Sequence, residues 1–275
     1  MNFDRVHSDA FISGSAVSPE KLKSDKNQVL RVENLSVLFG GFVALNQLNF
    51  AMCSNEIKCL IGPNGAGKTT LIDVLTGRVK PNQGSAIFLD HIRLCDKDES
   101  EINQLGIGRK FQKPSVFEAQ SVFENLELAL NSRKTIFNRI FKKISSSDFD
   151  RILAVSELIN LFPKLGKSAG ILSHGEKQWL EMGMLMVSDP KLMLLDEPVA
   201  GMSRAEADRT SEMLRSLSTN RAILVVEHDM EFVRKIADNV TVMDQGSVIA
   251  EGNMMQIQND RKVREVYLGD EKSSF

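Results

Sequence analysis

The order of apolar and polar residues predicts strands first, then a block of helices, then strands and helices in alternation. From Val29 onward, short apolar runs bounded by turn residues are typical of β-strands. We expect strands at 30–39, 45–52, 57–62 and 84–90. Between the last two, the helical spacing in KTTLIDVLTG predicts a helix that ends near Gly77, a residue type that often terminates helices.

The spacing is helical between Gln112 and Pro190, where apolar residues recur at i, i+3 and i+4 and strand signals are few. The segments that show it are 121–132, 137–143, 147–162 and 175–188. We interpret this block as a helical lobe inserted into an α/β core.

Strand signals return after Pro190. The apolar runs LMLLD (192–196) and AILVVE (222–227) predict strands that are buried on both faces. A helix over 204–217 is expected between them, and another helix begins near Met230. The segment VTVMDQGSVIAEG then predicts a hairpin, followed by a short helical tail. This alternation indicates the α/β fold class.

Composition and charge limit the kinds of partner. A net charge of −2 gives no basis for wholesale binding of nucleic acid or anionic lipid. The three cysteines have no metal-binding spacing, which fits a reducing compartment. No apolar run approaches the roughly 20 residues that cross a bilayer, and the N-terminus has no secretion signal. We therefore expect a soluble chain with a disordered extension over 1–27 and a tail over 270–275.

The segment GPNGAGKT fits the phosphate-binding pattern G-x-x-x-x-G-K-[ST], and it lies between a predicted strand and a predicted helix, as that pattern requires. Glycines let backbone N–H groups curl around phosphate oxygens, and the helix N-terminus adds its positive dipole end. Lys68 is expected to reach the β- and γ-phosphates, and the Thr69 hydroxyl to bind Mg²⁺. A glycine-rich turn with an incidental lysine is the alternative, which the strand–loop–helix context disfavours. The expected nucleotide-binding residues here are Gly62, Pro63, Asn64, Gly65, Ala66, Gly67, Lys68, Thr69 and Thr70.

The apolar run 192–195 is followed by two carboxylates, Asp196 and Glu197. A buried strand that delivers Asp196 beside the phosphate-binding segment predicts a Mg²⁺ site, and Glu197 is then placed to polarise an attacking water. A general base of this kind contributes roughly 10²–10⁴ in rate. Strands often end in solvated acids, so the pattern depends on the neighbouring phosphate-binding segment for its meaning.

The segment LSHGEKQ (172–178) opens a helix and resembles the LSGGQ signature of the ABC ATPase family. In that family the signature of one subunit caps the γ-phosphate bound to the other, so the resemblance implies this role for the Ser173 hydroxyl and the Gly175 N–H. A Ser-x-Gly before a helix is more often only an N-cap. The order of the other motifs favours the functional interpretation.

Further positions resemble motifs of the same family. Gln112, after the strand-like IGRKF, resembles the glutamine that senses Mg²⁺ and the attacking water. His228 resembles the histidine that contacts the γ-phosphate, Phe39 resembles the aromatic residue that stacks on adenine, and residues 200–203 occupy the D-loop position. Each also has an ordinary alternative as a core, surface or turn residue. Four residues depart from the family pattern: His174 and Glu176 in the signature, Ser203, where the D-loop usually has aspartate, and Phe39, which lacks a tyrosine hydroxyl although stacking needs only a π-face.

The resemblance covers residues 29–269 and implies the P-loop NTPase fold of ABC ATPases. That fold has a RecA-like core, an antiparallel β subdomain and an α-helical subdomain, here at about 113–188, within an ATPase domain over 28–269. The implied cofactors are ATP and Mg²⁺. The implied catalytic residues are Glu197, His228, Gln112 and Lys68, and the implied metal ligands are Thr69, Gln112 and Asp196.

The resemblance also implies the partners and the location. We expect a second ATPase subunit, identical or paralogous, and transmembrane permease subunits that dock near 113–125. A solute-binding protein acts indirectly, nucleic acid is no partner, and the chain works at the cytoplasmic face of the inner (plasma) membrane.

The particular residues in and around the motifs indicate a narrower group. The segments VLFGGFVALN, LSHGEKQWLEMGML, EPVAGMS and VYLGD are similar to branched-chain amino-acid-type importers, and His174 followed by KQWLE resembles their urea-transporting branch. Urea is therefore the expected solute, with branched-chain amino acids or another amide or amino acid as the alternative. A soluble ABC ATPase of translation, metal-cluster assembly or DNA repair is a further alternative, disfavoured because the chain holds one cassette and no coiled-coil heptads.

Overall fold

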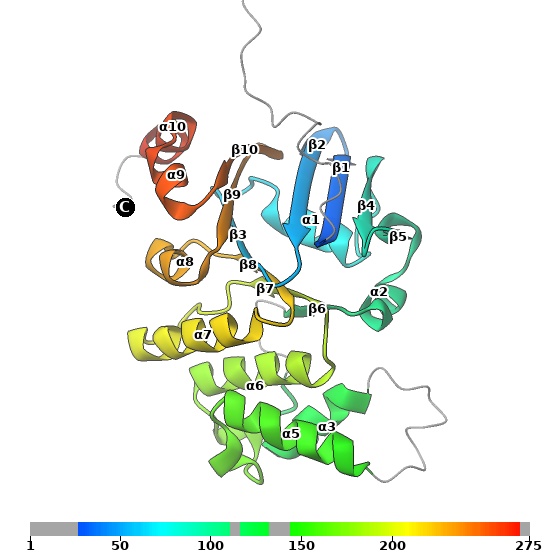
Figure 1. Ribbon diagram of the computed structural model, residues 1–275, viewed down its shortest axis with the longest axis vertical. Helices are drawn as coiled ribbons and strands as arrows, with labels where there is room; N and C mark the ends of the chain where they lie inside the picture. Colours follow the sequence, from blue (N-terminus) through cyan, green and yellow to red (C-terminus); the bar gives the residue numbers. More distant parts are fainter. Residues whose placement is uncertain (1–26, 111–115, 132–143, 270–275) are drawn as a thin grey trace, which may run out of the picture.

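The computed structural model describes residues 27–110, 116–131 and 144–269, and it contains two sheets and a helical lobe (Figure 1). Three predicted segments lie outside the described residues: the extension over 1–27 except residue 27 itself, the helix at 137–143, and the tail over 270–275. The other predicted strands and helices are present, so the α/β assignment is confirmed.

The core is a 6-stranded sheet, counted over the described residues, with the order β10-β9-β3-β8-β7-β6. All neighbours pair in parallel except β10, which forms the predicted hairpin with β9. Every residue of β3, β7 and β8 is buried, which confirms the prediction of strands covered on both faces. The strands are β3 (Ile57–Ile61), β6 (Ile107–Lys110), β7 (Leu192–Asp196), β8 (Ala222–Val226), β9 (Asn239–Asp244) and β10 (Ser247–Gly252).

A 4-stranded antiparallel sheet, again counted over the described residues, has the order β2-β1-β4-β5. Its strands are β1 (Gln28–Phe39), β2 (Phe42–Cys53), β4 (Gln83–Phe88) and β5 (Ile92–Arg93). The predicted strand at 45–52 begins earlier, at Phe42, because Gly40 and Gly41 adopt φ values of +52° and +95° and close a tight turn. Phe39 therefore lies directly opposite Phe42.

Alternate residues of the core strands face two different hydrophobic layers. Leu60, Leu194 and Leu224 pack with α1 and the antiparallel sheet, whereas Cys59, Leu195 and Val225 pack with α6, α7 and α8. The helices around the sheet are α1 (Lys68–Leu75), α2 (Glu99–Leu105), α7 (Arg204–Leu217), α8 (Met230–Ile236), α9 (Met254–Asn259) and α10 (Arg261–Gly269). This layering leaves the carboxyl ends of the parallel strands exposed to a loop layer, where open α/β sheets bind ligands.

The helical lobe consists of α3 (Val122–Asn131), α5 (Ser146–Leu158) and α6 (His174–Val187), and it projects from the sheet beside β6 and β7 (Figure 1). Trp179 connects it to the core, since its indole N–H donates a hydrogen bond of 3.0 Å to the Thr210 hydroxyl on α7. Three short 3₁₀ helices complete the described elements: η2 (Leu94–Asp96), η3 (Phe162–Lys164) and η4 (Ala169–Ile171).

Helix α2 is an element that the apolar spacing does not predict. It has one buried residue, Ile102, so it lacks the repeated apolar positions of an amphipathic helix. Its start is marked instead by a capping box, in which Asp98 and Glu101 bond to each other's backbone N–H groups.

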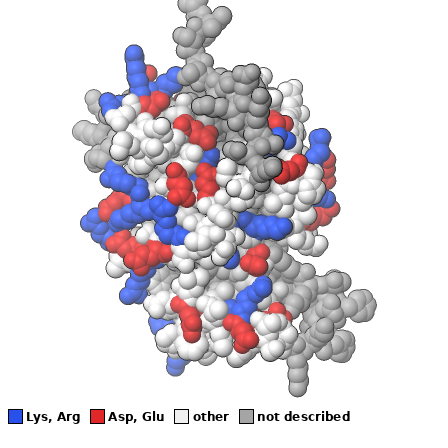
Figure 2. Space-filling model, in the orientation of Figure 1, with Lys and Arg blue, Asp and Glu red and all other residues white. Residues whose placement is uncertain are grey.

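Within 27–110, 116–131 and 144–269, no helix combines the length and the apolar character that crossing a membrane needs. On the face shown in Figure 2, lysine and arginine side chains are interspersed with aspartate and glutamate. That face therefore carries no extended field of a single sign.

We expect Leu224→Ala to lower the free energy of unfolding by roughly 2–5 kcal/mol, because Leu224 is fully buried in the central strand β8 and the truncation leaves a cavity. Chemical denaturation monitored by circular dichroism measures the change. Leu128→Ala is the matched control: Leu128 is exposed on α3, so its truncation is expected to stay within about 0.5 kcal/mol. Equal effects of the two substitutions would contradict the proposed packing.

Candidate active site

An open cleft of about 250 Å³ lies at the carboxyl ends of β3, β7 and β8. Its lining residues come from the β1–β2 turn and the start of β2, from residues 64–70, and from the ends of β7 and β8. They are Phe39, Phe42, Ala44, Asn64, Gly65, Ala66, Gly67, Lys68, Thr69, Thr70, Asp196, Glu197 and Val226. The tertiary structure thus brings residues 64–70 of the predicted phosphate-binding segment together with both predicted carboxylates and with Phe39, whereas Gly62, Pro63 and His228 are not among the lining residues.

The backbone of segment 62–69 requires glycine at two points. Gly62 has φ +150°, and a Cβ atom there would lie 2.1 Å from the carbonyl oxygen of Met243. Gly67 has φ +98°, and a Cβ there would lie 2.6 Å from the carbonyl oxygen of Ala44. Gly67 is also the N-cap of α1 and offers no side-chain cap, so the first turn of that helix, which lines the cleft with residues 68–70, has no side-chain acceptor for its N–H groups. Such a helix start is suited to an anion.

The Lys68 ammonium group is held by the loop that precedes it. Its Nζ donates hydrogen bonds to the carbonyl oxygens of Gly62 and Pro63, at 2.6 and 2.9 Å. Burial lowers the pKa of Lys68, and the nearby carboxylates of Glu197 and Asp196 act in the opposite direction. The cleft therefore holds a cation close to two acids.

Asp196 ends β7 almost fully buried, and an arginine that the sequence motifs do not include lies beside it. The Arg109 guanidinium on β6 contacts Asp73 of α1 at 2.5 Å and Asp196 at 3.7 Å. Burial raises the pKa of Asp196, and the Arg109 cation opposes that rise. Arg109 thus connects the phosphate-binding helix to the strand that carries the predicted metal ligand.

Glu197 and His228 form the second half of the site. Glu197 has φ +47°, a conformation that non-glycine residues rarely adopt and that is often retained at functional positions. Its N–H donates a hydrogen bond of 2.9 Å to the carbonyl oxygen of Val226, which aligns it with the end of β8. Its Oε1 lies 3.5 Å from Nδ1 of His228. The two predicted catalytic side chains therefore face each other across the ends of two parallel strands.

Phe39 and Phe42 stand on either side of the Gly40–Gly41 turn, and both line the cleft. The Phe39 side chain is 50% exposed, so its ring presents an accessible face. Phe42 was absent from the predicted site, although its position across a Gly-Gly turn from Phe39 is a hairpin signal in the sequence.

The signature residues lie on α6 and do not line this cleft. Ser173 is the N-cap of α6: its hydroxyl accepts the N–H of Glu176, and the Glu176 carboxylate accepts the N–H of Ser173. Glu176 also pairs with Lys164. The glutamate that departs from the family pattern thus completes a capping box. Gly175 lies against Glu206, whose Oε1 would be 2.3 Å from a Cβ at that position.

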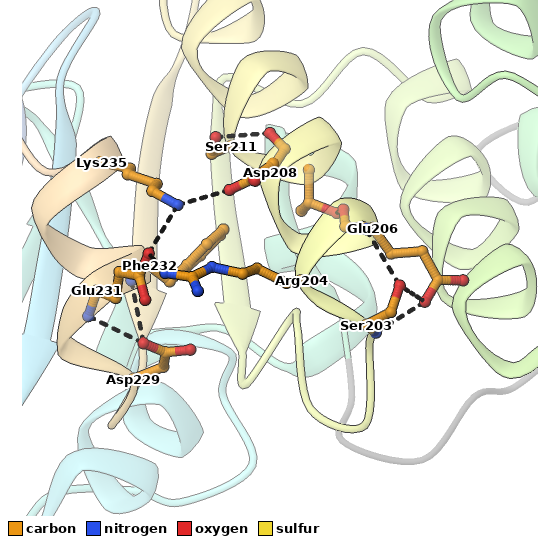
Figure 3. Close-up of polar contacts among 10 residues, drawn as sticks. Ser203, Arg204, Glu206, Asp208, Ser211, Asp229, Glu231, Phe232 and Lys235 are labelled. Atoms are coloured by element: carbon orange, nitrogen blue, oxygen red, sulfur yellow. Dashed lines mark hydrogen bonds and ion pairs between the residues drawn. The ribbon is translucent and has the colours of Figure 1, made fainter.

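His174 links the signature helix to the loop that follows β7. Its Nε2 and the Nε2 of Gln178 each lie 3.2 Å from the carbonyl oxygen of Ala200. Ser203, the departure at the D-loop position, is the N-cap of α7 and forms a capping box with Glu206 (Figure 3). Both departures therefore have a local structural role within one chain.

Gln112 lies outside the described residues, so its predicted contact with the site stays a prediction. Besides Phe42, the motifs missed Asp73, Arg109 and Glu227. Arg109 follows a glycine in a short strand, and Glu227 directly precedes His228, but neither spacing marks a partner. Only the pairing of β6 with β7, and of β7 with β8, places these side chains at the site.

Two family models match the sequence. The model described as ABC transporter matches residues 45–200, and the model described as branched-chain amino acid ATP-binding cassette transporter matches residues 247–273. The first includes the phosphate-binding segment, the signature and the Asp196–Glu197 pair.

Individual relatives match over nearly their whole length. The high-affinity branched-chain amino acid transport ATP-binding protein LivG of Escherichia coli K12 is 36% identical over 88% of this chain and 98% of its own. The corresponding protein BraF of Pseudomonas aeruginosa is 32% identical with the same coverage. A solved ATP-binding cassette of an ABC transporter, in its ADP conformation, is 30% identical over 88% of this chain and 99% of its own, with a TM-score of 0.78.

Proposed function

Because the chain belongs to the ABC transporter family and is an ATPase of the ATP-binding cassette type, we propose that it energises the import of a branched-chain amino acid or a related small amide. The ATPase domain extends over 28–269 in this proposal, with the helical subdomain at about 113–188. The observation that carries the proposal is a single cleft that joins an uncapped helix start, Lys68 and Glu197, with the His228 imidazole next to Glu197.

The cleft fits a nucleoside triphosphate with Mg²⁺. The N–H groups of α1 and the Lys68 ammonium suit phosphate oxygens, and the Phe39 ring suits stacking on a base. The Thr69 hydroxyl and the Asp196 carboxylate both line the cleft and would hold the metal, together with Gln112. Mg²⁺ prefers oxygen ligands and needs only one or two carboxylates besides phosphate and water. When bound, it supplies positive charge to the β- and γ-phosphate oxygens.

The side chains divide the hydrolytic step between them. Lys68 changes partners from the carbonyl oxygens of Gly62 and Pro63 to the β- and γ-phosphates. Glu197 accepts a proton from the attacking water, and His228 is placed to contact the γ-phosphate and orient Glu197. Gln112 links the site to the helical lobe in this proposal.

The site is completed by a second subunit. Within the described residues, none of 172–178 lines the cleft of its own chain, which supports a role for Ser173 and Gly175 across a dimer interface. Two cassettes, identical or paralogous, then enclose two nucleotides between them. ATP bound in this way favours the closed pair, and hydrolysis removes the bridging phosphate.

The chain works with membrane-spanning partners in this proposal, at the cytoplasmic face of the inner membrane. Permease subunits dock near 113–125, of which 116–125 belong to the described residues. Phe117 there is exposed, although its backbone N–H is bonded to the buried Asn125 side chain. A rigid segment with an exposed aromatic ring supports a docking role. A solute-binding protein delivers the solute to the permease.

Branched-chain amino acids are the solute that the names of the relatives support, and this was the alternative in the sequence analysis. Urea is the solute expected from the residues around His174, and it stays a prediction. An ATPase does not touch the solute, so the signature itself carries no solute chemistry. Purification of the intact membrane complex, followed by uptake of leucine and of urea into proteoliposomes, distinguishes the two.

The proposed activity is tested by Mg²⁺-dependent phosphate release from ATP by the complex with its permease. We expect release that needs Mg²⁺ and rises when solute and its binding protein are present. A complex that transports solute while Lys68 and Glu197 are both replaced would refute the proposal.

A further inference from the structure

We propose that Glu227 is a positioning residue that sets the separation of Glu197 and His228. The inference rests on the roles proposed above for those two residues. Glu227 follows β8 directly, and its side chain is 2% exposed. It is not among the residues that line the cleft.

The two carboxylate oxygens of Glu227 bond to two different loops. Oε1 accepts a hydrogen bond of 3.3 Å from the N–H of Val199, in the loop after β7. Oε2 accepts the N–H groups of His228 and Asp229, at 3.1 and 3.4 Å, in the loop after β8. One buried side chain therefore joins the loop of Glu197 to the loop of His228.

The loop of Glu197 is held on both sides of Pro198. Before Pro198, the Glu197 N–H donates to the carbonyl oxygen of Val226. After it, the Val199 N–H donates to Glu227. Pro198 has no N–H of its own. The left-handed backbone of Glu197 is thus kept in place by two bonds to the end of β8, and one of the two comes from Glu227.

The same carboxylate orients His228. The His228 N–H is bonded to Oε2, and the imidazole Nδ1 lies 3.9 Å from that oxygen and 3.5 Å from Oε1 of Glu197. Loss of the bonds to Glu227 releases both loops, so the distance between Glu197 and His228 is no longer set. A misplacement of about 1 Å costs roughly 10²-fold in rate at an enzyme site.

The placement of Glu227 is unfavourable for its charge. Burial raises the pKa of its carboxyl group, while the N–H groups of Val199, His228 and Asp229 oppose that rise. Within the described part of the chain, its Oε2 also lies 3.9 Å from Nδ1 of the His228 imidazole. A buried carboxylate next to a reacting site, with its oxygens directed at backbone donors, is typical of a functional residue.

The helices that follow the two loops are tied as well (Figure 3). Arg204 in the first turn of α7 contacts Glu231 in the first turn of α8, and Lys235 bridges Glu231 and Asp208. These exposed pairs connect the ends of the loops that lead into α7 and α8, whereas Glu227 connects the ends that follow β7 and β8.

The test replaces Glu227 in the full chain and separates turnover from binding. Glu227→Gln keeps the shape of the side chain, but its amide NH₂ group cannot accept a hydrogen bond. One of the two loops therefore loses its acceptor. We expect kcat to fall by roughly 10–100-fold, with the affinity for Mg·ADP and the KM for ATP within about twofold of wild type. Glu227→Asp keeps the charge but is one methylene too short to reach both loops, and it should show the same split.

A double-mutant cycle distinguishes positioning from general loss of structure. In a His228→Ala background, Glu227→Gln should cost at least about threefold less in kcat than it does in wild type, because the pair it positions is gone. Asp238→Asn is the matched control: Asp238 also accepts a backbone N–H, that of Ile57 at 2.8 Å, but at the opposite end of β3. Its kcat should stay within about twofold of wild type.

Three outcomes overturn the inference: unchanged kcat in both folded Glu227 variants, equal losses of kcat and nucleotide affinity, or full additivity with His228→Ala. Glu197→Gln in the same assay separates this from the proposed function. If Glu197→Gln hydrolyses normally, the proposed role of Glu197, on which this inference rests, fails. If Glu197→Gln is inactive while the Glu227 variants are normal, only the role of Glu227 fails.

Discussion

Glu197→Gln is expected to reduce ATP hydrolysis by roughly 10²–10⁴-fold while nucleotide binding stays close to wild type. The amide keeps the shape of the side chain and its approach to His228, but it does not accept a proton from water. The phosphate-binding segment and Lys68 are untouched, so affinity for Mg·ADP should change by less than about threefold. Phosphate release and equilibrium titration on the same preparation measure the two quantities.

With hydrolysis blocked, the closed pair of subunits should accumulate when ATP is bound. Size-exclusion chromatography with ATP and with ADP tests this, because the pair is expected with ATP. The control is Glu265→Gln, because Glu265 is exposed on α10 and pairs only with Arg261 among the contacts seen in the described chain. That variant should hydrolyse ATP at the wild-type rate within about twofold. A Glu197→Gln variant with wild-type turnover would remove Glu197 from the proposed mechanism.

Lys68→Ala is expected to weaken nucleotide binding by roughly 10–100-fold. Hydrogen bonds to charged groups contribute about 1.5–3 kcal/mol each, and every 1.4 kcal/mol is a factor of ten in affinity. The lysine is already desolvated and held near Asp196 and Glu197, so its loss also leaves those acids less compensated against phosphate. Isothermal titration with Mg·ADP measures the change.

The control for this substitution is Lys262→Ala, which removes an exposed lysine on α10 far along the chain from the cleft. It should bind Mg·ADP as the wild type does. Lys68→Ala should also retain its fold, because among the described residues the side chain bonds to the loop that precedes it. Unaltered affinity in Lys68→Ala would show that the phosphate does not lie at the start of α1.

Local sequence was sufficient for the elements whose pattern repeats over short distances. The runs Leu192–Asp196 and Ala222–Val226 are apolar throughout because both faces of a central parallel strand are covered. The segment 62–69 can be recognised from the sequence because a tight phosphate-binding turn requires glycine where φ is positive or where another backbone comes close. The capping boxes at Ser173 and Ser203 follow the same local logic, with glutamate three residues on.

The missed features depend on residues that are distant in the sequence. Helix α2 buries one apolar side chain, so periodicity gives no signal for it. Arg109 reaches Asp196 only because β6 pairs with β7, and each pair of partners, such as Arg109 and Leu194, is 85 residues apart along the chain. A single sequence holds no information on which charged side chains such a pairing brings together.

The sequence by itself determined the chemistry of the protein: a phosphate-binding turn, a strand that ends in two acids, and a helix cap of signature type, each set by local backbone geometry. Only the tertiary structure decided how these parts combine. Pairing of β3, β7 and β8 places their carboxyl ends at one edge, so Lys68, Asp196 and Glu197 meet in one cleft while Ser173 faces elsewhere. The tertiary structure also decided that Glu227 bonds to two loops. A buried carboxylate needs hydrogen-bond donors, and here the backbone N–H groups of Val199 and His228 supply them.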